Sequence, residues 1–120
     1  MEEEVKNWIK QAKEDYKSAK FNLEGKQYKV AIFLCQQSVE KAFKALLLKK
    51  KGEIRKIHDL VILGKEVNAS ENMINKLKEL TLAYVYSRYP DVKQENNLKE
   101  KAFVFLKTAE DVLKWTRLNL

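Results

Sequence analysis

Two long segments with apolar residues at three- and four-residue steps, separated only by a short turn at Gly25, limit what this chain can fold into. The first runs from about Glu3 to Glu24 and the second from about Gln27 to Lys50. This spacing places the apolar side chains on one face of an α-helix. Each helix would be about 35 Å long at ~1.5 Å per residue, and so short a connection forces the two helices to pack antiparallel. The sequence therefore predicts a helical hairpin at the centre of the fold.

Three further helices are predicted after the hairpin. A short one spans about Asp59 to Val67, and a longer one follows a cap at Ser70 and carries an apolar stripe as far as Val85. A last helix begins after a cap at Asn96 or Asn97 and again has apolar residues at helical spacing.

The chain contains few residues that interrupt helices. Pro90 cannot lie inside a helix and predicts a turn between Ser87 and Asp91. Glycine and proline are otherwise scarce, and alternating runs typical of strands are missing. We therefore expect an all-α fold, an up-and-down bundle of four long helices and one short helix, formed by a single domain over residues 1–120.

The sequence also predicts where such a protein resides. Cys35 is the single cysteine, which excludes an internal disulfide, and it lies in an apolar helical stretch. The first residues lack the apolar region of a signal peptide, and no run approaches the roughly 18 apolar residues of a membrane span. We expect a cytoplasmic protein that does not enter the membrane.

The formal net charge of +7 is concentrated in one part of the chain. Between Lys26 and Lys56 there are nine basic and two acidic residues, and the rest of the chain balances to zero. Such a segment is typical of a surface that binds nucleic acid, nucleotide or an acidic protein. A solvated lysine-rich surface is the alternative, because cations in the last helical turn, such as Lys49 to Lys51, interact favourably with the helix dipole.

Residue counts exclude several kinds of catalytic and metal site. With one histidine, one cysteine and no glycine-rich loop, the chain cannot form a zinc site of the usual ligands, a P-loop or a dinucleotide-binding fingerprint. His58 is expected to cap or pack the start of the short helix. We predict no catalytic residue, no metal site and no cofactor.

Polar residues flank the apolar stripe of the second helix. Gln36, Glu40 and Lys44 fall four apart on one face, and Lys41 lies on the next face. These groups either pair with one another or, together with Asp15 at the edge of the first helix's stripe, line a groove.

The groove would face a turn that carries Arg88, Tyr89 and Asp91. An arginine offers planar donors suited to carboxylate or phosphate, and a tyrosine ring can stack on a base. Pairing of Arg88 with Asp15 or Glu40 is the alternative, and Asp91 could cap the turn.

Three stretches together make the chain resemble the HEPN domain family. They are the segment "QQSVEKAFKALL" of the predicted hairpin, the later "HDL" and the turn "YSRYPD" before the last helix. The resemblance implies a bundle of four to five helices, commonly a homodimer. It also implies a role in prokaryotes beside a small nucleotidyltransferase partner, as a toxin–antitoxin-like system that binds nucleotides.

Many members of that family are metal-independent ribonucleases that use an arginine followed by four to six residues and a histidine. Counting from Arg88, the histidine would fall where this chain has Lys93, Gln94 and Glu95, and His58 lies upstream in another element. Without that imidazole no group is in place to move the protons of cleavage.

We therefore expect a non-catalytic HEPN module, homodimeric, that binds a nucleotide, RNA or a partner nucleotidyltransferase. The predicted nucleotide or phosphate ligands are Arg88, Tyr89, Lys41 and Lys44, and the predicted polar residues of the groove are Asp15, Gln36, Glu40 and Asp91. Two alternatives are a metal-independent ribonuclease toxin that uses Arg88 and a purely structural dimerisation scaffold.

Overall fold

The computed structural model describes residues 2–54, 56–87 and 97–120. All the regular structure in these ranges is helical, so the prediction of an all-α fold with four long helices and one short helix is confirmed. The helices are α1 (Glu2–Glu24), α2 (Tyr28–Lys51), α3 (Leu60–Glu66), α4 (Glu71–Ser87) and α5 (Leu98–Asn119).

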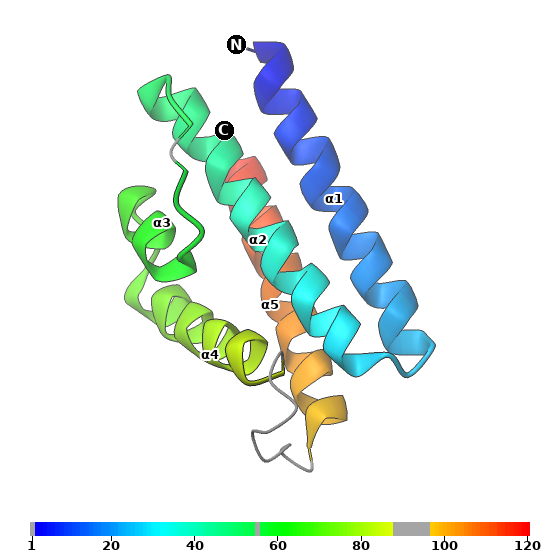
Figure 1. Cartoon of the computed structure of the whole chain (residues 1–120). Coiled ribbons are helices and arrows are strands. Elements are labelled where there is room, and N and C mark those ends of the chain that lie inside the picture. Colours follow the sequence, from blue (N-terminus) through cyan, green and yellow to red (C-terminus); the bar gives the residue numbers. More distant parts are fainter. Residues whose placement is uncertain (1, 55, 88–96) are drawn as a thin grey trace.

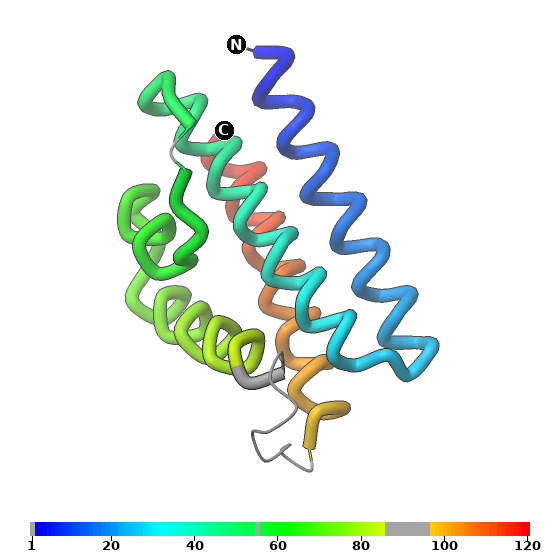
Figure 2. Tube along the Cα trace, viewed as in Figure 1, coloured from blue at the N-terminus to red at the C-terminus, as the bar shows by residue number. Residues whose placement is uncertain are grey.

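The four long helices alternate in direction, and α2 is the central one (Figure 1). The helices α1 and α2 form the predicted antiparallel hairpin, and α5 runs beside both of them, parallel to α2. The short α3 and the inclined α4 pack on the other side of α2, as the trace in Figure 2 also shows. Because α2 contacts all four other helices, it is covered along several faces.

The core is built mainly from α2. Phe43 is fully buried and meets the ring of Trp115 edge-on, with ring centroids 6.2 Å apart. Burial of such a side chain stabilises the fold by roughly 1.5–3 kcal/mol. The other large, fully buried apolar side chains come from α2, α3, α4, α5 and the α3–α4 connection: Ile32, Leu46, Leu47, Val39, Leu60, Leu63, Val67, Leu77, Leu80 and Val112.

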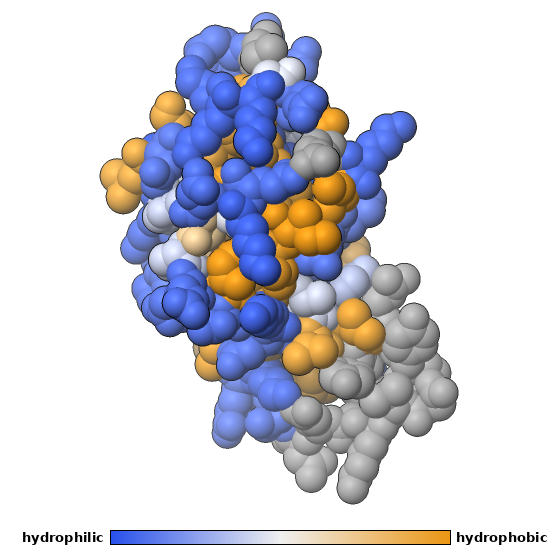
Figure 3. Space-filling model, turned by 90° about the vertical axis from the view of Figure 1, so that its left-hand side faces the viewer, coloured by the Kyte–Doolittle hydropathy of each residue, from blue (hydrophilic) through white to orange (hydrophobic). Residues whose placement is uncertain are grey.

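Some apolar residues expected in the core are on the surface instead. Phe103 is 55% exposed, and the buried aromatic residue of that helix is Phe105, at 4%. Val30 and Phe33, which widen the apolar stripe at the start of α2, are also exposed. Apolar side chains further gather on the side of the molecule where α3 and α4 lie (Figure 3), where Ile62 and Leu82 are exposed.

The turn between α1 and α2 places its strained residue one position later than expected. The amide of Lys26 donates to the carbonyl of Leu23, and the amide of Gln27 donates to the carbonyl of Asn22. This pair of hydrogen bonds is a Schellman motif, whose capping residue adopts a left-handed conformation. That residue is Lys26, with φ of 64°, and not the preceding Gly25.

Ser70 caps α4 as predicted. The side chain of Asp59, and not His58, caps α3, and the predicted cap Asn97 makes no side-chain hydrogen bond at the start of α5. Asp59 accepts hydrogen bonds from the amides of Val61 and Ile62 at the start of α3. Ser70 accepts one from the amide of Met73 at the start of α4. No helix in the described ranges is long and apolar enough to cross a membrane.

Candidate binding site

A row of polar side chains along α2 is buried in the bundle. Gln36, Glu40 and Lys44 are each about 5% exposed, since α2 is covered on several faces. Phe33 lies on the same face of the helix, three residues before Gln36, and its exposed ring stacks on that of Tyr84 of α4 at 5.7 Å. The row therefore has an aromatic pair at one end.

The middle of the row is a hydrogen-bonded cluster around one carboxylate. The Lys44 Nζ donates to Glu40 Oε2 at 3.0 Å, and the same oxygen lies 2.9 Å from His58 Nδ1. An ionised carboxylate only accepts hydrogen bonds, so Nδ1 carries the hydrogen in this contact. The Lys44 Nζ also lies 5.7 Å from the centroid of the Trp8 ring of α1, within the range of a cation–π interaction.

Two oxygen atoms of the row lack a hydrogen-bond donor within the described residues. They are Gln36 Oε1 and Glu40 Oε1, both shielded from solvent. A buried acceptor without a donor destabilises a folded protein by about 1–3 kcal/mol, and such atoms are few in native structures. Because the two residues are one helical turn apart, they form a pair of unmet acceptors on the face of α2 that also carries Phe33.

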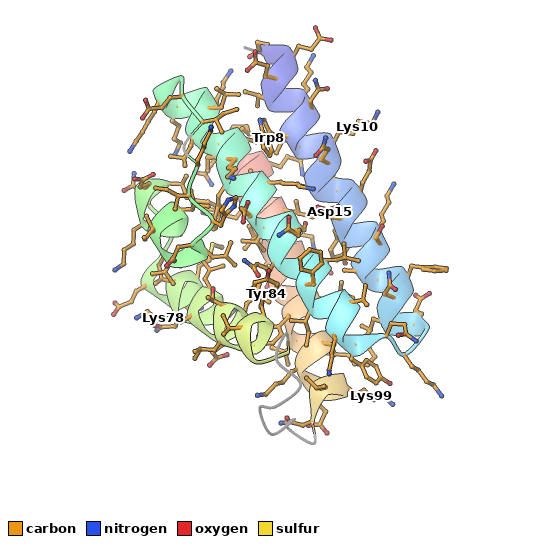
Figure 4. The ribbon with its side chains drawn as sticks, viewed as in Figure 1. Trp8, Lys10, Asp15, Lys78, Tyr84 and Lys99 are labelled. Atoms are coloured by element: carbon orange, nitrogen blue, oxygen red, sulfur yellow. The ribbon has the colours of Figure 1, made fainter. Side chains whose placement is uncertain are left out.

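Other polar contacts hold α1 against α2. The Lys41 Nζ donates to Asp15 Oδ2 at 2.6 Å, and Figure 4 shows Asp15 between the two helices. The Ser38 hydroxyl donates to the carbonyl of Ala12 at 2.7 Å, in a buried position. These contacts fix the side of α2 next to the polar row.

The predicted site residues are thus partly brought together. Within the described chain, Lys41 pairs with Asp15, and Lys44 pairs with Glu40. Gln36 lies one turn from Glu40. Three of the predicted residues, Arg88, Tyr89 and Asp91, lie outside the described residues. The four predicted ligands and the four predicted polar residues of the groove therefore stay predictions.

Three lysines of the basic segment between residues 26 and 56 are held in ion pairs. Besides the paired Lys41 and Lys44, Lys49 binds Glu2 of α1 at 2.7 Å. This contact lowers the pKa of the Glu2 carboxyl through its hydrogen bond and the charge of the lysine. Charge counted along the chain therefore overstates the free positive charge of this segment.

Sequence reasoning missed the pairing of His58 with Glu40. The two residues are eighteen apart and belong to different elements, so no helical spacing relates them. The "HDL" motif was the available signal, since its aspartate caps α3 and thereby places the preceding histidine at the start of that helix. The part of the chain that the structure describes contains no group of three or more histidine, cysteine and acidic side chains able to hold a metal.

The surroundings shift the pKa of two further groups, the buried Cys35 and the partly buried Tyr16. Burial raises the pKa of the Cys35 thiol to about 12. The Tyr16 hydroxyl donates to Glu110 Oε2 at 3.2 Å, which ties α1 to α5. Burial, and then this hydrogen bond, raises the pKa of Tyr16.

Comparisons with known proteins agree on one family. The HEPN domain family model matches residues 5–119. A relative named "Putative toxin MJ1304", from Methanocaldococcus jannaschii, is 32% identical over 126 residues, which cover 91% of this chain and 83% of the relative.

Two solved structures share the fold over almost the whole chain. TT1696 from Thermus thermophilus is 26% identical with a TM-score of 0.84, covering 97% of this chain and 98% of its own. ST0689, described as an archaeal HEPN homologue, is 32% identical with a TM-score of 0.76, covering 94% of both chains.

Proposed function

The chain belongs to the HEPN domain family, and on that premise we propose that it is a non-catalytic binding module of a toxin–antitoxin-like pair. Its ligand is a nucleotide or RNA, bound at the polar row of α2, and its partner is a small nucleotidyltransferase. The name of the M. jannaschii relative supports the toxin–antitoxin context. The predicted cytoplasmic location fits a ligand of this kind.

The pair of unmet acceptors carries the nucleotide part of the proposal. Gln36 Oε1 and Glu40 Oε1 are buried without a donor in the described chain. The exocyclic amino group of adenine, or the amino and imino groups of guanine, are donors of the kind these oxygens lack. The exposed Phe33 ring, stacked on Tyr84, provides a surface on which the base can stack.

Arg88 and Tyr89, which follow α4 in the sequence, would complete the site. An arginine fork suits the phosphate of a nucleotide. Lys41 and Lys44 would contribute only by exchanging their present partners, Asp15 and Glu40, for phosphate. The absence of a histidine at the family position after Arg88 favours binding over cleavage.

Isothermal titration calorimetry with ATP, GTP and a short single-stranded RNA tests this proposal. We expect one of the three ligands to bind. The variant Gln36→Leu should bind that ligand about tenfold more weakly, which corresponds to one lost hydrogen bond to the base. The matched control is Gln37→Leu, the same change on the neighbouring, half-buried position, which should leave the affinity unchanged.

Gln36→Leu should not weaken the fold, because it replaces an oxygen that lacks a donor by an apolar group of similar size. Loss of binding in this variant therefore reports on the site and not on stability. The proposed site is wrong if none of the ligands binds, or if Gln36→Leu and Arg88→Ala both bind as tightly as the wild type. Co-purification with a co-expressed nucleotidyltransferase from the adjacent gene tests the partner.

Self-association is the remaining part of the proposal. The exposed apolar residues on the side of α3 and α4, Ile62 and Leu82, favour a homodimer that covers them. Light scattering after gel filtration should give twice the monomer mass, and the monomer mass at all accessible concentrations would contradict a homodimer.

A ribonuclease is the second candidate, because His58 is paired with a buried carboxylate. Glu40 accepts from His58 Nδ1, and in the neutral imidazole this leaves the other ring nitrogen as a base on a side chain that is 76% exposed. A histidine held in this way can take the proton from a ribose 2′-hydroxyl. RNA cleavage in the presence of EDTA that is lost in His58→Ala would establish this function, and intact RNA after long incubation would exclude it.

A further inference from the structure

Five lysines of α1 form a stripe along one face of the helix. At ~100° per residue they fall within an arc of about 80°. They are Lys6, Lys10, Lys13, Lys17 and Lys20, all exposed. Within the described residues none of them takes part in an ion pair, unlike Lys41, Lys44 and Lys49 of α2.

The lysine stripe borders a groove with an apolar floor. The groove has a volume of about 430 Å³ and lies between α1 and the C-terminal end of α5. Val5, Ile9 and Leu120 supply its apolar surface, and Glu14 is its one acidic residue. The first four lysines of the stripe line the rest of it. A free cationic edge therefore stands directly beside an apolar strip.

We propose that this groove is the docking surface for an amphipathic helix of a partner protein, with apolar side chains on one face and acidic side chains beside them. The apolar face would cover Ile9 and Leu120, beside the largely buried Val5, and the carboxylates would pair with the lysine stripe. From Lys6 to Lys17 the stripe extends over roughly 16 Å, which is about three turns of a bound helix.

A second copy of this chain does not fit the groove. A two-fold symmetric contact centred on the stripe would bring the same surface of both copies together, so lysines would face lysines. RNA would satisfy the lysines, but its phosphate backbone would leave the apolar floor uncovered. Charge and hydrophobicity together favour an acidic amphipathic helix.

The groove is separate from the polar row of α2. Trp8 and Asp15 lie between α1 and α2, whereas Lys10 points away from α2 (Figure 4). Docking at the groove therefore does not depend on whether the α2 row binds a nucleotide. Nucleotide titrations and peptide titrations can fail independently.

Fluorescence anisotropy with a designed peptide tests the proposal on the full chain. The probe is a labelled helical peptide with leucines at three- and four-residue steps and glutamates flanking them. We expect the peptide to bind the wild type. The double variant Lys10→Glu with Lys13→Glu should bind it with an affinity lower by about tenfold or more. The charge-matched control, Lys76→Glu with Lys78→Glu on exposed positions of α4, should bind as the wild type does.

A scrambled peptide of the same composition and a short labelled RNA complete the experiment. Weak binding of the scrambled peptide and of the RNA would support a surface that recognises an amphipathic helix. Equal binding of the scrambled peptide would show non-specific charge attraction and overturn the proposal. Tighter binding of RNA, lost in the Lys10 and Lys13 variant, would reassign the stripe to nucleic acid. Leu120→Asp should lower the affinity for the designed peptide, and an unaltered affinity would contradict an apolar floor of the groove.

Discussion

Replacement of Lys44 with methionine would leave the carboxylate of Glu40 inside the bundle without its main partner. The two side chains are each 7% exposed, and their charged atoms are 3.0 Å apart. Methionine keeps the unbranched shape of lysine, so the change removes the charge and little packing. His58 remains 2.9 Å from the same carboxylate and compensates for part of the loss.

The expected destabilisation follows from these contacts. Removal of one partner from a buried ion pair reduces the free energy of unfolding by about 3–5 kcal/mol. Loss of the cation–π contact with Trp8 adds about 0.5–1 kcal/mol, and the retained hydrogen bond to His58 offsets a similar amount. We expect a net loss of about 3–5 kcal/mol, because the two smaller contributions cancel, and this lowers the melting temperature of a domain of this size by roughly 12–20 °C.

Urea unfolding followed by far-UV circular dichroism measures this change. The control is Lys107→Met, because Lys107 is 63% exposed and pairs with Asp111 at 3.2 Å. Such an exposed pair contributes less than about 1 kcal/mol. The double variant Glu40→Leu with Lys44→Met should regain most of the lost stability, since it buries no unpaired charge.

Two results would contradict a buried, unpaired charge in Lys44→Met: a loss of less than about 1 kcal/mol, or a double variant that is no more stable than the single one. The first result would mean that the pair is solvated in the protein. The second would mean that the loss comes from packing and not from an unpaired charge.

Three more predictions concern the fold. Lys26→Gly should raise the free energy of unfolding by about 1 kcal/mol, because glycine adopts the left-handed conformation of Lys26 without strain; an unchanged or lower urea midpoint would contradict this. Since the folded pKa of Tyr16 is raised, its stabilising effect is complete below the unfolded pKa of about 10 and is lost as pH rises through the folded value. Stability measured above about pH 10 should therefore fall more steeply in the wild type than in Tyr16→Phe, and parallel curves would argue against the burial of Tyr16. Cys35, with its pKa raised to about 12, should react with a thiol reagent at least ~1000-fold more slowly in the native protein than in urea; comparable rates would show that the thiol is accessible.

The helical hairpin is predictable because its apolar residues repeat at helical spacing over two long segments joined by a short turn. Such a local signal also locates the cap Ser70, whose hydroxyl accepts from the amide three residues ahead. These features depend on contacts within a few residues of the chain, and sequence patterns record such contacts well.

Features that depend on distant neighbours are less predictable. The start of α5 is apolar on several sides, so spacing alone does not decide that Phe105 is buried and Phe103 is exposed. The same holds for Phe33, whose exposure depends on the position at which α4 packs against α2. In each case the packing partner, and not the helix itself, selects the buried face.

The candidate site shows the same limit. The four-residue spacing of Gln36, Glu40 and Lys44 is visible in the sequence, but their burial and the contact with His58 come from tertiary packing. A count of charge along the chain does not reveal the lysine stripe of α1. In such a count the acidic residues of the first turn cancel lysines that lie together on one face of the helix.

A titration with the bound nucleotide, followed in a proton–nitrogen correlation spectrum of the labelled protein, tests the proposed site most directly. We expect the signals of the Gln36 side-chain amide and of the backbone amides around Glu40 to shift most, because the base supplies donors to the side-chain oxygens of these two residues. Shifts confined to other parts of the chain, with the Gln36 side-chain signal unchanged at saturation, would contradict it.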